Sequence, residues 1–71
     1  MTFSTYLRRR KSYTEAGQRL KAALVGLPEE VQTPEQVHAW LLLSGASRID
    51  RETARRAAKD WRQLLRTRRA G

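Results

Sequence analysis

The apolar positions in the last third of the chain recur with the period of an α-helix. At a rotation of about 100° per residue, six apolar side chains fall within about 60° on either side of Trp61. They are Ala54, Ala57, Ala58, Trp61, Leu64 and Leu65. The pattern predicts one long amphipathic helix over residues 50–69, capped by Ser47 or Asp50 and followed by a short tail of residues 70–71.

Two shorter helices are expected in the first third of the chain. Thr2 should cap the first, whose apolar side has i, i+3, i+4 spacing. That side consists of Phe3, Tyr6 and Leu7. Ser12 and Glu15 match a capping box, with Ser12 as the N-cap of a second helix that continues to about Val25. Its expected apolar face is Tyr13, Ala16, Leu20, Ala23 and Leu24. Gly17 lies within this helix, where a missing Cβ would let another helix approach closely.

The clearest helix start in the sequence lies at Thr33. Thr33 has the properties of an N-cap, Pro34 suits the first helical position, and Gln36 completes a capping box. The helix should run to about Leu43, with Leu42 pointing away from the apolar face. The residues expected to be buried are Val37, Trp40, Leu41 and Leu43.

A short helical turn over residues 29–32, with Val31 pointing inward, is the last expected element. No stretch of the sequence has the alternation of a β-strand. The expected fold class is therefore all-α, a compact bundle of four short helices and one long C-terminal helix. Residues 1–71 should form a single domain, since a chain of 71 residues supports only one small core.

Charge is distributed unevenly along the chain. The formal net charge is +8 and the isoelectric point is near 11.4. Residues 1–11 carry a net charge of +4, residues 12–27 of +1, residues 28–47 of −3 and residues 48–71 of +6. A positive charge of this density favours polyanionic partners such as DNA or RNA. The bias towards arginine also fits a GC-rich genome, so charge alone does not decide the function.

Six cations share one side of the long C-terminal helix, within an arc of about 80° beside its apolar face. This basic edge consists of Arg51, Arg55, Lys59, Arg62, Arg66 and Arg69. No acid lies one turn away from them on the same arc, and the expected intrahelical pairs join Arg56 to Asp60 or Glu52. A second cluster of cations ends the first helix. It consists of Arg8, Arg9, Arg10 and Lys11, which suit either phosphate contact or the negative end of a helix macrodipole.

Catalysis, cofactors and membrane insertion are not expected. His38 is the only histidine and should be a solvated surface residue, and there is no cysteine to bind a metal or form a disulfide. No nucleotide-binding glycine motif is present. The longest apolar run, residues 39–43, is too short to span a bilayer. No apolar segment typical of a signal peptide follows Met1, so a cytoplasmic protein is expected.

Five short segments resemble the YozE-like small helical domains, whose fold is sterile-alpha-motif-like. The segments are Phe3-Ser4-Thr5-Tyr6-Leu7, Ala16-Gly17, Leu27-Pro28, Trp40-Leu41 and Ala57-Ala58-Lys59-Asp60-Trp61. The chain departs from the family pattern at Leu27 and at Leu64 or Leu65, where aromatic residues are usual, and in its basic rather than acidic charge. The resemblance implies a helical bundle and carries almost no information on function.

Two functional hypotheses follow. In the first, the basic edge, helped by Arg8–Lys11, binds the nucleic-acid backbone without base readout. In the second, the protein is an association module that docks on an acidic protein or on itself, for example a regulator encoded by a phage or mobile element. The acidic surface around residues 29–35 would then meet the basic helix of another copy, with Leu42 as an exposed anchor. Trp40 and Trp61 are expected in the core, and a membrane-surface helix is the least favoured alternative.

Overall fold

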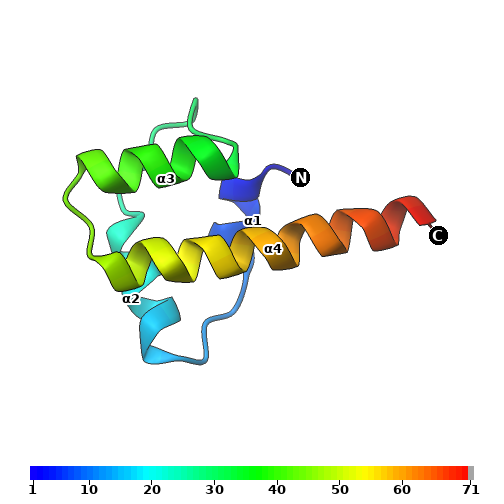
Figure 1. Cartoon of the computed structure of the whole chain (residues 1–71), viewed down its shortest axis with the longest axis horizontal. Helices are drawn as coiled ribbons and strands as arrows, with labels where there is room; N and C mark the ends of the chain where they lie inside the picture. The colour runs from blue at the N-terminus through cyan, green and yellow to red at the C-terminus, as the bar shows by residue number, and fades with distance from the viewer. Residues whose placement is uncertain (71) are drawn as a thin grey trace.

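The computed structural model describes the backbone of residues 1–70 and the side chains of residues 1–68. It contains four helices (Figure 1), and the described residues form no strand. The helices are α1 (Phe3–Arg9), α2 (Glu15–Ala23), α3 (Pro34–Leu43) and α4 (Arg48–Ala70). The prediction of an all-α fold with a long last helix is therefore confirmed.

The prediction of four short helices is wrong, because there are three. Residues 29–32 form a turn in which the N–H of Val31 donates to the carbonyl of Pro28 at 3.1 Å. The N–H of Gln32 donates instead to Oε1 of Gln36 at 2.9 Å. Gln36, which belongs to the capping box of α3, thus accepts from the N–H of Gln32 that a continuing helix would need. An isolated turn gains too few hydrogen bonds to persist as a helix. Val31 still packs against the core, as expected.

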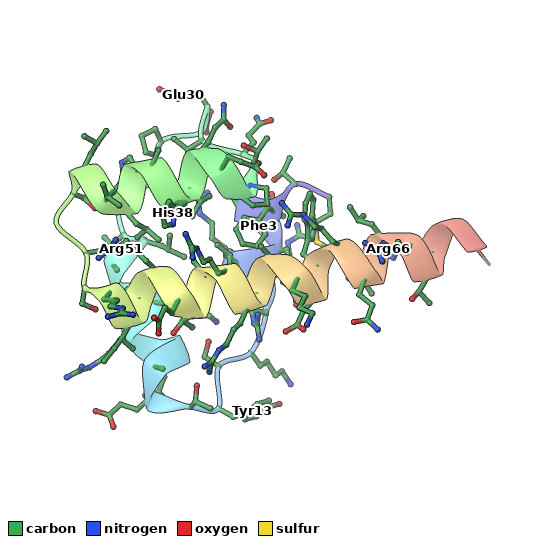
Figure 2. All side chains as sticks on the ribbon, viewed as in Figure 1. Phe3, Tyr13, Glu30, His38, Arg51 and Arg66 are labelled. Carbon is green, nitrogen blue, oxygen red and sulfur yellow. The ribbon has the colours of Figure 1, made fainter. Side chains whose placement is uncertain are left out.

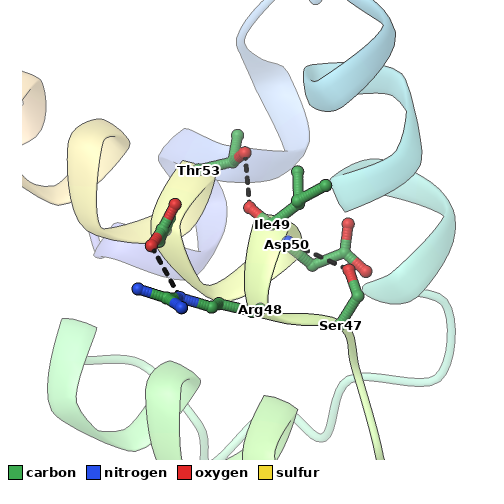
Figure 3. Close-up of polar contacts among 6 residues, drawn as sticks. Ser47, Arg48, Ile49, Asp50 and Thr53 are labelled. Carbon is green, nitrogen blue, oxygen red and sulfur yellow. Dashed lines mark hydrogen bonds and ion pairs between the residues drawn. The ribbon is translucent and has the colours of Figure 1, made fainter.

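The starts of α2 and α4 differ from their predicted positions. The N-cap of α2 is Thr14 rather than Ser12, and its Oγ1 accepts from the N–H of Gly17 at 3.0 Å. Of the two predicted caps of α4, Ser47 is the one present, and it accepts from the N–H of Asp50 at 3.2 Å (Figure 3), so the helix begins at Arg48 and not at residue 50. At α3 the expected capping box of Thr33 and Gln36 is present.

The core lies where α1, α2 and α3 meet one face of α4. Its buried residues are Phe3, Leu7, Leu20, Leu24, Leu27, Val37, Leu41, Ala54, Ala57 and Ala58. Trp40 and Trp61 are half-buried and pack against this cluster, and the ring of Trp61 lies 5.6 Å from that of Phe3. The C-terminal part of α4 extends beyond the other helices (Figure 1). For that reason Leu64, expected on the apolar face, is exposed.

Three further expectations about packing are wrong. Tyr13 is 85% exposed because it precedes α2 rather than lying on it. Leu43 is 87% exposed because it lies about 140° around α3 from the midpoint of Val37 and Leu41. The nearest neighbours of a Cβ at Gly17 would be the side chains of Ser12 and Thr14, at 3.1–3.2 Å, and both residues precede α2 rather than belonging to another helix.

We expect Leu41→Ala to lower the free energy of unfolding by about 3 kcal/mol, since it removes a fully buried side chain and leaves a cavity. The matched control is Leu43→Ala, which truncates the same residue type at an exposed position two residues along α3 and should change stability by less than about 0.5 kcal/mol. Urea denaturation followed by circular dichroism measures both. Equal losses in the two variants would contradict the assigned face of α3.

Candidate nucleic-acid interface

The residues of the basic edge follow one another along one side of α4. Arg48 lies on the same side, because it is eighteen residues before Arg66 and five helical turns bring it into register. Arg48 is not part of the predicted basic edge, because the predicted helix begins at residue 50 and the observed one at Arg48. From Arg48 to Arg66 the cations cover about 27 Å of helix. The backbone of Arg69 continues α4, but its side chain lies outside the described residues.

The cations of the basic edge differ in their surroundings. Arg55, Lys59 and Arg66 are exposed, and Figure 2 shows Arg66 on the part of α4 that extends beyond the bundle. Arg51 is half-buried, and its Nε is covered and has no hydrogen-bond partner among the described residues. Arg62 is bound by an acid, because its Nη2 donates to Oε1 of Glu35 at 3.0 Å.

The Arg62–Glu35 pair corrects the expectation that the basic edge keeps all of its charge for a partner. The two residues are 27 positions apart in the chain, and α3 brings the carboxylate across to α4. The spacing of acids along one helix does not indicate a contact with another helix. The expected pairing of Arg56 with Glu52 is also wrong, since Glu52 accepts from Nε of Arg48 at 3.1 Å.

The Arg8–Lys11 cluster is partly used by the fold. Nη2 of Arg8 donates to the carbonyl of Leu27 at 2.9 Å, which ties α1 to the loop before α3. The guanidinium of Arg10 lies over the ring of Tyr6, 5.5 Å from its centroid. Arg9 and Lys11 are exposed.

The two sets of cations do not form one surface. Arg10 and Lys11 line a hollow of about 370 Å³ between α2 and α4, together with Arg56 and Asp60 of α4. The basic edge borders α3 instead. The fold thus places the Arg8–Lys11 cluster on the α2 side of α4 and the basic edge on the α3 side.

A cleft of about 470 Å³ separates α3 from α4 along the basic edge. It is lined by Pro34, Glu35, His38, Ala54, Arg55, Ala58 and Arg62. The space between the helices exists because the side chains of Ala54 and Ala58 are small, and two arginines of α4 border it. The cleft therefore has an apolar floor and a predominantly cationic wall.

His38 is half-buried rather than solvated, so its expected position is wrong. Figure 2 shows it between α3 and α4, and its Nδ1 is buried without a hydrogen-bond partner among the described residues. The apolar face of α3 is centred on Val37 and Leu41 rather than on Trp40. His38 lies only about 60° from Leu41 around the helix and therefore flanks that face.

Within the side chains that the structure describes, no group of three or more His, Cys, Asp or Glu residues is placed to hold a metal ion. Over the same part of the chain, no helix combines the length and apolarity needed to cross a membrane. The chain has no significant match to a protein-family model, to a curated protein or to a solved structure.

Proposed function

We propose that this protein binds nucleic acid, largely independently of base sequence, through the basic edge of α4. The observation that carries the proposal is the exposure of Arg55, Lys59 and Arg66 on one side of a single helix. Arginine presents planar, paired N–H donors to phosphate oxygens. Duplex DNA carries one phosphate charge per about 1.7 Å of axis, so a cationic line of this length can meet several phosphates.

The position of α4 supports contact with an extended polyanion. Its C-terminal part projects beyond the bundle (Figure 1), so a strand can lie along it without meeting α1, α2 or α3. The basic edge contains only Arg and Lys, and no Asn or Gln that would read adenine. Without such amides, we expect the edge to contact mainly phosphate oxygens, which arginine can bind in pairs.

The proposal includes neither catalysis nor a cofactor or small-molecule substrate. The chain has no cysteine, and His38 is its single histidine. Nδ1 of His38 has no hydrogen-bond partner among the described residues with which to form a catalytic group. A cytoplasmic location would give the protein access to nucleic acid. The sterile-alpha-motif-like assignment, which rests on the resemblance to YozE-like domains, is part of the proposal, and its support is limited to the all-helical fold with a long last helix.

Binding to a short DNA duplex should weaken steeply with salt. If about four phosphates are contacted, the slope of log K against log[salt] is about −4, because each neutralised phosphate contributes about 0.9. Fluorescence anisotropy with two duplexes of unrelated sequence measures the slope and the sequence dependence together. No binding at low salt, or a large preference for one duplex, would contradict the proposal.

Neutralising two exposed cations of the basic edge should reduce the salt dependence of binding. Arg55→Gln with Arg66→Gln removes two phosphate contacts, so we expect the slope to fall in magnitude by about 2. The matched control is Arg19→Gln with Arg56→Gln, which lowers the net charge equally at exposed residues off the basic edge. The control should retain most of the slope. Equal effects of the two pairs would show that net charge, and not this edge, drives binding.

An association module is the second candidate function. Leu42 and Leu43 are 53% and 87% exposed at the end of α3. The exposed acidic residues are complementary in charge to the basic helix of another copy of this chain; they are Glu29, Glu30 and Glu35. Sedimentation equilibrium separates the candidates. We expect an 8.2-kDa monomer at all concentrations without nucleic acid, whereas growth in mass with concentration would favour self-association.

A further inference from the structure

The cleft between α3 and α4 brings cations from one helix to a half-buried imidazole on the other. Arg55 and Arg62 come from α4, and His38 comes from α3. Arg55 and Arg62 are seven residues apart, or about 10.5 Å along the helix, a distance that two long flexible side chains can close around one group. The N-terminal end of α3 borders the same cleft, and its macrodipole adds positive potential there.

The donors in this cleft suit a phosphate group. Each guanidinium presents several N–H donors in one plane, and two oxygens of one phosphate group can accept from two of them at once. Nδ1 of His38 is covered and has no hydrogen-bond partner among the described residues. A buried polar atom without a partner costs free energy, so a ligand oxygen that the ring could meet after a small rotation would be favoured.

A carboxylate already occupies part of this cleft. Oε1 of Glu35 accepts from Arg62 at 3.0 Å, and the two side chains are 75% and 52% exposed respectively. An ion pair so open to solvent is weak, since water screens it and holding two long side chains in place costs entropy. A phosphate group carries comparable acceptor oxygens and can displace Glu35 from Arg62 without a change in the fold.

We propose that the α3–α4 cleft binds one phosphate group through Arg55, Arg62 and His38, and that Glu35 competes with this phosphate for Arg62. The inference deepens the proposed function, on which it rests, by assigning one backbone phosphate to a defined position. Glu35 then acts as a built-in competitor for Arg62 that lowers the affinity for nucleic acid.

Removing the competitor should strengthen binding. We expect Glu35→Gln to tighten duplex binding at low salt by about two- to fivefold more than the control Glu15→Gln, a range that reflects the strength of an exposed ion pair. The control is matched, because Glu15 is also a glutamate in the first turn of a helix and also pairs with an arginine. It lies on α2, and its partner Arg19 is on the same helix at 4.0 Å. Both variants raise the net charge by one, so their ratio isolates the cleft.

A double-mutant cycle tests whether the gain passes through Arg62. In an Arg62→Gln background the extra gain from Glu35→Gln should vanish, because the carboxylate then has no guanidinium to occupy. A gain that persists at full size would assign the effect to general electrostatics and overturn the inference. Circular dichroism of each variant confirms that the helices are retained.

Titration with inorganic pyrophosphate separates the cleft from the wider basic edge. In ¹H–¹⁵N spectra we expect the largest shifts at His38 and at the Nε–H groups of Arg55 and Arg62, and smaller ones at Arg66. Duplex binding without cleft shifts, and with equal effects of Glu35→Gln and Glu15→Gln, would overturn the cleft and leave the proposed function standing. Cleft shifts with pyrophosphate but no duplex binding would overturn the proposed function and indicate a small phosphate-bearing ligand. Absence of both would overturn both.

Discussion

The structure depends on the close packing of the other three helices against the alanine face of α4. Ala54, Ala57 and Ala58 are buried, and their short side chains let larger residues close on the helix backbone. Alanine supplies little apolar area itself, so most of the hydrophobic free energy comes from the residues that cover it, such as Phe3 and Leu41. Because α1, α2 and α3 all contact α4, its apolar face is covered, and the basic edge lies beside that face, where it borders α3.

The same alanines shape the cleft. Ala54 and Ala58 belong to the core and also line the space between α3 and α4. A longer side chain at either position would fill the cleft or push α3 outward, which costs free energy in a packed interior. Packing and the candidate binding site are therefore coupled, and the ion pair of Arg62 with Glu35 forms where the two helices approach.

The sequence predicts the elements of this fold better than their contacts. Local signals placed the start of α3 at Thr33 correctly, because a capping box involves only neighbouring residues. They predict the wrong N-cap for α2, because Ser12 and Thr14 are both residue types that favour this position. The position of His38 could not be predicted without knowing that Val37 and Leu41 define the inner face of α3. The Glu35–Arg62 pair required the antiparallel approach of two helices, which no helical period within one segment contains.

The placement of the cations supports the proposal that the basic edge serves a partner rather than α4 alone. Arg66 and Arg68 lie in the last turns of the helix, where positive charge stabilises the macrodipole. Arg55 and Lys59 lie in the middle of α4, more than one turn from either end, where this effect has decayed. They are exposed, so their charges add no buried ion pair, and they repel each other at i,i+4 spacing. The proposed polyanion would neutralise these charges and so relieve the mid-helix repulsion.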